Sequence, residues 1–400
     1  MSKGLGLNVL RRYEMESVFY TEEEQKYQRE AREFFQREVA PRIVSMDKEG
    51  KYPFGVLRKL GERHYIGVRF PSKYGGGGRD LLSETIIGEE TGAATYALAC
   101  ARGVAHHAAY CIWKHGSEEQ RRKHLPLIFS GESIISECIS EPEVGSDAAR
   151  MKTRAVKDGN GYVISGEKRF MASGGVANLL LVFAITNPDV HPTKGMSAFI
   201  VESDRENIHS YEEFNTMGFR GLRIVSELVF NGVKVPRENL VGEENRGFGY
   251  LADTLDQERT VAAGSMIGPA RTCLEIALRY SAERKAFHRR LREFEAISFK
   301  IADMALRIEA ARLVTIKAAR MIDRGLKAAK EAAMAKLMVA ETAFKVTSDA
   351  MQILGGIGYT DKYPVERHFR DARGFALAGG SNEVMQLVIQ REVYREAGLL

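Results

Sequence analysis

The stretch ISFKIADMALRIEAARLVTIKAARMI, residues 297–322, places its apolar residues at the spacing of one helix face. The stretch KEAAMAKLMVAETAFKVTSDAMQIL, residues 330–354, shows the same helical spacing of apolar residues. Helices of this kind bury their apolar faces against one another. After Gly247 the only prolines are Pro269 and Pro364, so little interrupts helix formation in this part. The C-terminal part of the chain is therefore predicted to be a helical bundle.

Upstream of the bundle, between about residues 132 and 236, the texture changes to that of β-strands. The segment TRAVKDGNGYVISG, residues 153–166, indicates a hairpin that turns at Asp158 and Gly159. Further strands are expected in three segments rich in β-branched and aromatic residues: LLLVFAI (179–185), MSAFIVE (196–202) and SELVFNGVKV (226–235). This part is predicted to be a β domain.

The N-terminal part of the chain again has a helical texture. TEEE at residues 21–24 is a capping box, and FFQREVAPRI (34–43) continues the apolar stripe of the helix that it opens. ALACARGVAHHAAYCIW (97–113) is rich in small residues and is typical of a buried helix, whereas PSKYGGGG (71–78) is a loop. The order of textures predicts an α+β protein of three domains, at residues 1–131, 132–243 and 244–400.

Composition excludes several classes of function. The 400 residues are 44% apolar, and 58 basic and 53 acidic residues mix along the chain to give a net charge of +5, so no basic block indicates nucleic acid as a partner. The four cysteines form no CxxC pair, and the nine histidines show no metal-binding spacing, so we expect a reducing cytosol and no metal. The longest apolar run, LLLVFAI, is too short to span a bilayer, which favours a soluble cytoplasmic protein.

Several short motifs are compatible with chemistry, and each also has an ordinary structural interpretation. SEPEVGSD (140–147) is either a phosphate- or carbonyl-binding turn or a capped loop, and GEKRFMASGG (166–175) is either the edge of a flat-ring site or a strand end. RKAFHRRL (284–291) is either a ligand-binding segment or a solvated helix end. QILGGIGYT (352–360) either lets the backbone approach a ligand closely or is a glycine C-cap. In LAGGSNEV (377–384), a glycine pair precedes an N-cap, a place where backbone N–H groups are free to bind a carbonyl or an anion.

Taken together and in this order, these motifs resemble the acyl-CoA dehydrogenase family over essentially all of residues 20 to 395. The resemblance implies an N-terminal helical domain, a middle β-barrel or sandwich domain and a C-terminal four-helix bundle, with FAD between the last two. It also implies the α,β-dehydrogenation of an acyl-CoA thioester to a trans-2-enoyl-CoA, with electrons passed to electron transfer flavoprotein. A homotetramer, built as a dimer of dimers that share FAD across subunits, is expected by the same resemblance.

The base that removes the α-proton is the main departure from the common family pattern. Many members carry the catalytic glutamate directly before the glycine of the LAGGSNEV turn, where this chain has Gly379. The branches that resemble long-chain and isovaleryl-CoA dehydrogenases carry it on a bundle helix before an arginine, and LDQER places Glu258 there. The alternative is a helix-surface glutamate paired with Arg259 or with a neighbouring turn. We expect Glu258 to be the base and the Gly379 N–H to polarise the thioester oxygen, with Glu383 or Asp371 as the bases to consider if this fails.

The resemblance carries further site residues onto this chain. Those implied to bind FAD are Glu137, Ile139, Ser140, Gly145, Ser146, Phe170, Met171, Ala172, Arg284, Phe287, Glu295, Gln352, Gly355, Gly356, Ser381 and Glu383. Those implied to contact substrate are Ser146, Asp256, Arg259, Gly380, Ala99 and Gly103. The small residues Ala99 and Gly103 favour a medium or long, or a branched, acyl chain, and the neighbouring Arg102 either faces a polar acyl end or, more commonly for a lone arginine, lies on the surface.

Two other interpretations stay open at this point. Ala172 lacks the hydroxyl that the family usually places near flavin N5, which keeps an acyl-CoA oxidase or a desulfinase-type flavoenzyme on the same fold in consideration. A binding or assembly protein with a decayed site is the third. Flavin content and the fate of its electrons separate the three.

Overall fold

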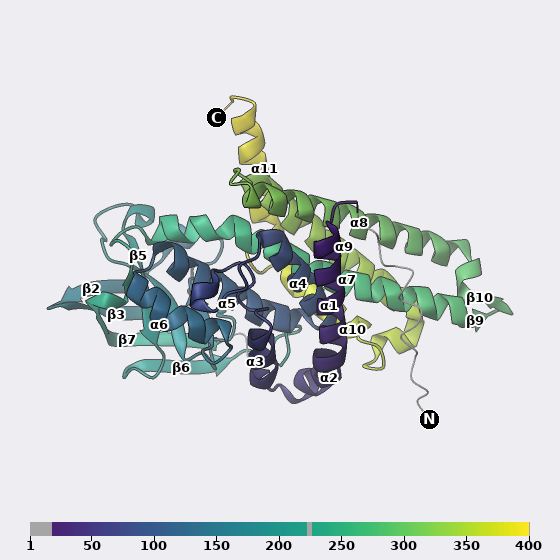
Figure 1. Cartoon of the computed structure of the whole chain (residues 1–400), viewed down its shortest axis with the longest axis horizontal. Coiled ribbons are helices and arrows are strands. Elements are labelled where there is room, and N and C mark those ends of the chain that lie inside the picture. Colours follow the sequence, from purple (N-terminus) through teal and green to yellow (C-terminus); the bar gives the residue numbers. More distant parts are fainter. Residues whose placement is uncertain (1–17, 222–225, 400) are drawn as a thin grey trace.

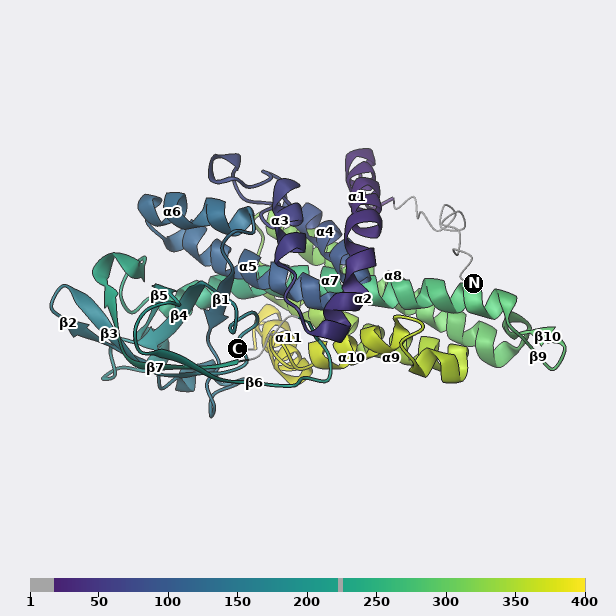
Figure 2. The same ribbon diagram turned by 90° about the horizontal axis from the view of Figure 1, so that it is seen from below.

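The computed structural model describes residues 18–221 and 226–399. Figure 1 shows the β-strands at one end of an elongated molecule and long helices running to the opposite end. Figure 2, seen from below, shows the N-terminal helices stacked on one side of α7 (Gly247–Glu283) and α10 (Val365–Phe375) on the other side. The three predicted textures therefore correspond to three regions packed around one long helix.

The N-terminal region is helical, as predicted. Its elements are α1 (Glu22–Phe34), a π turn (Phe35–Val39), α2 (Ala40–Glu49), α3 (Phe54–Glu62), α4 (Leu81–Ala94), α5 (Tyr96–His115) and α6 (Glu118–Phe129). The capping box is confirmed, because the Glu24 N–H donates to Thr21 Oγ1 and the Thr21 N–H donates to Glu24 Oε2 at 2.8 Å. Helix α5 is largely buried, as its small residues predict.

The middle region is a single sheet. Its strands are β1 (Ile135–Cys138), β2 (Arg154–Asp158), β3 (Gly161–Lys168), β4 (Leu179–Ile185), β5 (Met196–Glu202), β6 (Ile208–Glu213), β7 (Ser226–Pro236) and β8 (Leu240–Val241). They are ordered β6-β7-β3-β2-β4-β5-β8, and β1 pairs with β4. The predicted hairpin is confirmed: Asp158 pairs with Gly161 across the turn. All residues of β4 are buried, which explains why its sequence is a continuous apolar run.

The C-terminal region is the predicted helical bundle. It consists of α7 (Gly247–Glu283), a small hairpin of β9 (Lys285–Ala286) and β10 (Arg289–Arg290), α8 (Glu295–Asp323), α9 (Ala329–Leu354), α10 (Val365–Phe375) and α11 (Asn382–Glu396). Small and medium apolar residues such as Ala263, Met304 and Val339 form a core between these helices. Helix α9 ends at Gly355, whose φ of +67° makes it the glycine C-cap that the sequence allows.

Helices α4 and α7 approach each other very closely because glycines face one another across their contact. A Cβ atom added at Gly92 would lie 1.8 Å from the Ser265 carbonyl oxygen. One added at Gly268 would lie 2.1 Å from the carbonyl oxygen of Glu89. Only glycine permits this separation, and it fixes the position of α7, which carries the candidate base.

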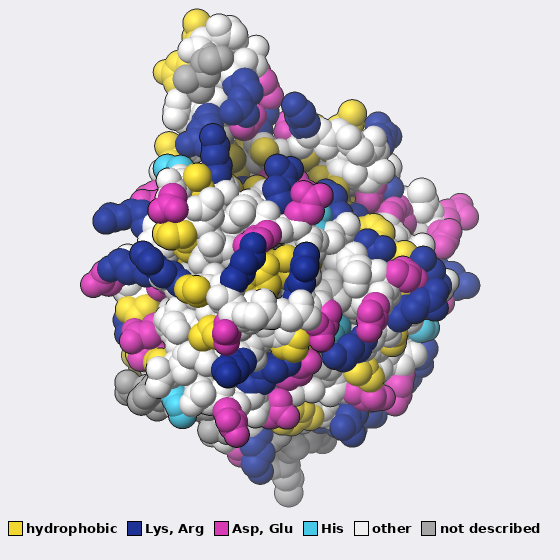
Figure 3. Space-filling view, turned by 90° about the vertical axis from the view of Figure 1, so that its left-hand side faces the viewer, with side chains coloured by type: hydrophobic (Ala, Val, Ile, Leu, Met, Phe, Trp, Pro, Cys, Tyr) yellow, Lys and Arg dark blue, Asp and Glu magenta, His cyan; other side chains and the backbone are white. Residues whose placement is uncertain are grey.

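Three further observations bear on function. Figure 3 shows acidic and basic side chains intermixed over the face at the sheet end, with no broad patch of one charge. In the described part of the chain, no helix is both long and apolar enough to cross a membrane. The same part holds no cluster of side chains arranged to bind a metal ion.

Candidate active site

Glu258 and Gly379 lie beside each other, although Glu258 is on α7 and Gly379 is in the turn between α10 and α11. Glu258 lies on α7 with 29% of its side chain exposed. Its Oε1 atom is 3.6 Å from the position that a Cβ atom at Gly379 would occupy. The carboxylate from the bundle helix thus reaches the turn from which the usual glutamate is missing. In the described part of the chain Glu258 forms no ion pair with Arg259, so that part of the alternative finds no support.

The turn at Gly379 joins α10 to α11 in a conformation that favours glycine. Gly379 and Gly380 have φ values of +63° and +88°. Ser381 caps α11, because its side chain accepts a hydrogen bond from the Val384 N–H at 3.3 Å, which confirms the predicted N-cap. The Gly379 N–H donates to no residue that the structure describes. A free backbone donor therefore lies next to the Glu258 carboxylate.

A histidine that the sequence interpretation did not single out completes this arrangement. His107 is buried on α5, and its Nε2 atom lies 3.7 Å from Glu258 Oε2. Its Nδ1 atom bonds to Glu137, and Nε2 also bonds to Thr254. One signal could have identified it: His107 lies four residues after Gly103, so the two share a helix face.

Comparison with known proteins agrees with this geometry. The acyl-CoA dehydrogenase N-terminal, middle and C-terminal domain models match residues 21–132, 136–233 and 245–394. The chain belongs to the acyl-CoA dehydrogenase family. It is 37% identical to the short-chain specific acyl-CoA dehydrogenase of Clostridium acetobutylicum, over 94% of this chain and 99% of that one. It is 35% identical to the probable acyl-CoA dehydrogenase YngJ of Bacillus subtilis, with the same coverage. The solved structure of butyryl-CoA dehydrogenase from Megasphaera elsdenii superimposes with a TM-score of 0.90 at 35% identity, over 94% of this chain and 99% of that one.

Acyl-CoA dehydrogenases use FAD, and the middle domain offers a surface that fits its flat ring. Phe170 has a φ of +58°, and its side chain is 64% exposed. Its ring stacks on Phe214 with centroids 5.5 Å apart, so one face of an aromatic platform is left open. The adjoining loop at residues 140–147 is solvent-exposed at Gly145 and Ser146, and nothing lies within 4 Å of a Cβ atom placed on Gly145. The platform and the loop are suited to hold an isoalloxazine and its attached phosphates.

The other residues expected near the flavin ring lie on or just after β1, shortly after β3, and at the start of α11. Ile139 and Ser140 follow β1, Met171 is buried, and the Ala172 carbonyl accepts a hydrogen bond from the Ser136 hydroxyl at 2.8 Å. Glu137 is turned instead toward His107, so its side chain belongs to the network around Glu258. Ser381 and the exposed Glu383 open α11.

The remaining residues expected to bind FAD lie at the far end of the bundle. They are Arg284, Phe287, Glu295, Gln352, Gly355 and Gly356, and all are exposed. Figure 1 places the β9–β10 hairpin at the opposite end of the molecule from the sheet. Lys300 near the start of α8 lies 3.4 Å from Asp349 near the end of α9, so the α9 end lies beside this tip. One chain therefore does not bring the two groups together.

The residues expected to contact substrate differ in how deeply they are buried. A Cβ atom at Gly103 would meet nothing within 4 Å, so this face of α5 borders open space. Ala99 is instead packed in the core of the bundle. Arg259 is buried and lies 3.7 Å from Asp256, whose pKa is raised by burial. Arg102 corrects an expectation, because it is fully buried and paired with Glu84 rather than on the surface.

The two fallback bases are placed less favourably than Glu258. Asp371 on α10 is buried, and its Oδ1 atom accepts a hydrogen bond from the Phe219 N–H at 2.7 Å. Burial raises the pKa of Asp371 to about 6. Glu383 is exposed at the start of α11, and hydrogen bonds to its own backbone and to Ser381 lower its pKa.

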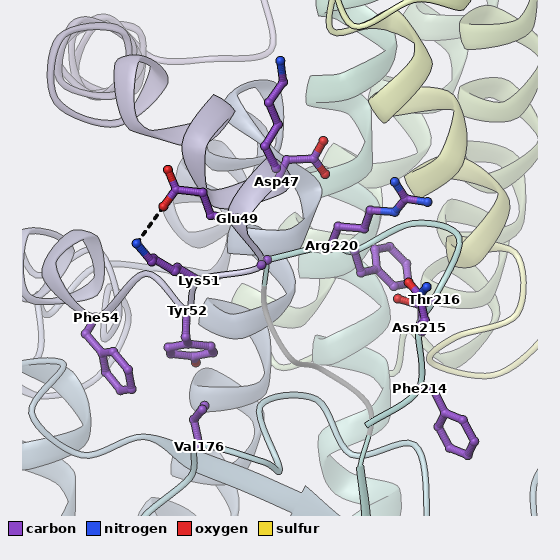
Figure 4. Close-up of a pocket in the computed structure, with 14 residues that line it drawn as sticks. Asp47, Glu49, Lys51, Tyr52, Phe54, Val176, Phe214, Asn215, Thr216 and Arg220 are labelled. Atoms are coloured by element: carbon purple, nitrogen blue, oxygen red, sulfur yellow. Dashed lines mark ion pairs between the residues drawn. The ribbon is translucent and has the colours of Figure 1, made fainter. Parts of the chain in front are cut away.

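A separate cleft of about 970 Å³ opens on the side of the molecule where the chain leaves α2. Figure 4 shows that Tyr52 and Phe54 line it from the α2–α3 connection, and that Phe214 lines it from the middle domain. The Lys51–Glu49 ion pair at 2.8 Å lies on its rim. Phe214 thus both lines this cleft and stacks on the ring of Phe170, whereas Glu258 does not line the cleft.

Proposed function

We propose that Glu258 is the general base of an FAD-dependent acyl-CoA dehydrogenase. The observation that carries this proposal is the position of its Oε1 atom, 3.6 Å from where a side chain at Gly379 would begin. A carboxylate there can reach the same α-carbon that a glutamate in the turn would reach. The proposal also accounts for why the turn can do without an acidic residue.

The reaction needs removal of the α-proton with stabilisation of the resulting charge, and it needs an acceptor for hydride. The residues of the chain provide the first of these. The α C–H bond breaks toward the Glu258 carboxylate, which takes the proton and leaves the electron pair on carbon. The Gly379 N–H is the proposed donor to the thioester oxygen, where negative charge develops. Bound FAD supplies the acceptor for the β-hydrogen, which leaves as hydride while the α,β double bond forms.

Arg259 and Lys336 are cationic side chains whose charges interact with that of the Glu258 carboxylate. Arg259 follows it on α7, and Lys336 on α9 is buried, with its Nζ atom 5.1 Å from the centre of the Phe375 ring. Burial first and then Arg259 lower the pKa of Lys336 to about 8, while Glu258 and Glu383 act in the opposite direction. Most Lys336 side chains are therefore protonated at neutral pH. Lys336 therefore contributes positive charge near the proposed base.

The acyl group is proposed to be branched, or of medium to long chain. The open space beside Gly103 leaves room for such a group. Relatives named for isobutyryl-CoA and for short or branched chains are 35% and 36% identical to this chain, which favours branching over length. Electron transfer flavoprotein is the proposed acceptor, and one relative of 35% identity is a subunit of a caffeyl-CoA reductase–Etf complex in Acetobacterium woodii.

A homotetramer is proposed as the functional assembly. The flavin platform and the exposed tip of the bundle are apart in one chain, and Phe287 at that tip is 87% exposed. A second copy of the chain can place its tip beside the first copy's platform and complete the FAD site. Helix α11 projects from the body of the molecule in Figure 1 with Leu387 half exposed, which also favours contact with another subunit.

An anaerobic titration of the yellow holoprotein with single acyl-CoA thioesters tests the proposed reaction. The panel is butyryl-, isobutyryl-, isovaleryl-, octanoyl-, palmitoyl- and glutaryl-CoA, and the reading is the loss of oxidised flavin absorbance. We expect bleaching by at least one member, with a branched thioester among the fastest. A protein that binds no flavin, or a flavin that no thioester bleaches, contradicts the proposal.

An acyl-CoA oxidase is the second candidate, because Ala172 lacks the expected hydroxyl. A prolyl acyl carrier protein oxidase of known structure shares the fold with a TM-score of 0.90 at 28% identity. Oxygen consumption with equimolar peroxide after bleaching favours the oxidase. Slow reoxidation by air and fast reoxidation by electron transfer flavoprotein favour the dehydrogenase.

A further inference from the structure

His107 is a buried residue that neither the expected motifs nor the proposed chemistry uses. It lies on α5, four residues after Gly103, where α5 packs against α7 and β1. Its ring contacts three acidic or hydroxyl side chains from two other elements: Glu137 on β1, and Thr254 and Glu258 on α7. Apolar residues fill most of the surrounding core, and burying a polar ring there costs free energy unless its nitrogens are hydrogen-bonded.

The hydrogen bonds of the ring determine which atoms donate. The Thr254 hydroxyl donates to the Leu251 carbonyl at 2.6 Å, so its oxygen can only accept from the imidazole. His107 Nε2 is therefore a donor. On the other side, Nδ1 faces the carboxylate of Glu137, which accepts. An imidazole that donates from both nitrogens carries a positive charge.

The charges around the ring agree with this assignment. Burial alone would lower the pKa of His107, but the carboxylates of Glu137 and Glu258 raise it to about 9, against the weaker opposition of Arg259. The imidazolium is thus the main form at neutral pH.

Each oxygen of Glu258 then has a distinct neighbour. Oε2 is 3.7 Å from His107 Nε2, and Oε1 lies on the side of Gly379. Arg259 and Lys336 are the other cationic side chains whose charges interact with Glu258. Tyr96 and Cys100 on α5 are neutral, because burial raises the pKa of the Tyr96 phenol and of the Cys100 thiol. Of these cations, His107 is the one whose contact with a Glu258 oxygen is within 4 Å.

We propose that His107 is a positioning residue: its imidazolium, anchored by Glu137 and Thr254, holds one oxygen of Glu258 so that the other points toward the α-carbon beside Gly379. This inference rests on the proposed role of Glu258 as the base. His107 contacts no reacting atom itself. It orients the carboxylate and places a positive charge beside it when an apolar acyl chain displaces water from the pocket.

The test compares His107→Gln with His106→Gln in FAD-loaded enzyme. Glutamine fills a similar volume and can donate a hydrogen bond but carries no charge, so the first variant removes the imidazolium. His106 is the matched control, since it is buried on the same helix but faces Glu84, with Nδ1 3.3 Å from that carboxylate. Anaerobic flavin reduction is followed from pH 5.5 to 9.5 with whichever of butyryl-CoA, isovaleryl-CoA or octanoyl-CoA reduces the wild type fastest.

We expect His107→Gln to lower the limiting reduction rate by about tenfold or more while the half-saturating acyl-CoA concentration changes by less than about threefold. The difference in rate between His107→Gln and the wild type should shrink above about pH 9, where His107 loses its proton in the wild type. His106→Gln should keep the wild-type profile, even if it melts at a lower temperature. A wild-type rate and profile in His107→Gln overturn the inference.

Failure of this inference and failure of the proposed base give different results. If Glu258→Gln is inactive and His107→Gln behaves as wild type, the base stands and only the positioning role falls. If Glu258→Gln reduces its flavin normally, both fall.

If His107→Gln does not fold, nuclear magnetic resonance of enzyme labelled at histidine Cε1 gives the answer without it. The His107 resonance is the one that titrates near pH 9, since burial lowers the pKa values of His106, His115, His124 and His368. Its titration should move to lower pH in Glu258→Gln, which lacks one of the carboxylates that favour the imidazolium. An unchanged titration overturns the inference.

Discussion

At the scale of single residues, the site is a carboxylate held between a cation and a glycine turn. Glu258 gains its position from α7, and the absence of a side chain at Gly379 leaves space for it. A glutamate at 379 would begin 3.6 Å from Glu258 Oε1, in van der Waals contact, and would bring a second negative charge beside the first. The glycine at 379 and the glutamate at 258 therefore belong together: one carboxylate, from α7, occupies the site.

Protonation of His107 links this site to stability. A folded-state pKa of about 9 lies above the ordinary 6.5, so protonated His107 contributes about 3 kcal/mol to the free energy of unfolding. That contribution is fully present below about pH 6.5 and is lost as the pH rises through 9. We expect the stability of His107→Gln to approach that of the wild type as the pH rises from 7 to 10.

Denaturant unfolding at several pH values measures this difference. Lys336, whose pKa is lowered to about 8, changes stability in the opposite direction above pH 8, so the wild-type curve alone mixes the two groups. Subtracting the His107→Gln curve isolates His107. A difference that stays constant from pH 6 to 10 would show that His107 does not titrate as stated.

At the scale of elements, the site depends on how α4 and α5 fix α7. The α4–α7 contact is so close that Gly92 and Gly268 leave no room for a methyl group. Helix α7 carries Thr254 and Glu258, and α5 carries His107, so a shift of α7 changes the distances within the network.

Gly268→Ala should therefore destabilise the protein, because its methyl group would overlap the Glu89 carbonyl oxygen. We expect a loss of about 2–3 kcal/mol and a lower melting temperature at equal protein and FAD concentrations. Gly249→Ala on the same helix is the control, since nothing lies within 4 Å of the added Cβ. It should be neutral or stabilising by up to about 1 kcal/mol, as alanine favours helix. Equal melting temperatures for the two variants would contradict this account of the α4–α7 contact.

At the scale of the whole molecule, the three-part architecture could be predicted from sequence because each part has its own periodicity. The buried run of β4, the capping box at Thr21 and the C-cap at Gly355 are local signals with local causes. The meeting of Glu258 with Gly379 could be expected only through family resemblance, and His107 was missed. Its partners Glu137 and Thr254 come from other elements, and periodicity does not report contacts between elements.

The proposed tetramer is a prediction at the same scale. We expect sedimentation equilibrium of the FAD-loaded enzyme to give four times the chain mass of 44.6 kDa. Phe287→Asp should weaken both assembly and FAD retention, because a charge would replace an exposed aromatic ring at the proposed shared site. A monomer that keeps one FAD per chain would show that no second copy is needed.

The central claim is that Glu258 takes the α-proton, and the rate of anaerobic flavin reduction in Glu258→Gln tests it most directly. Glutamine is nearly isosteric, so FAD binding and the fold should remain while the rate at saturating acyl-CoA falls roughly a hundredfold or more. Adding Gly379→Glu to that variant should restore part of the rate, although the positive φ at 379 costs about 1 kcal/mol of strain. Near-wild-type reduction in Glu258→Gln alone would contradict the claim and direct attention to Glu383 or Asp371.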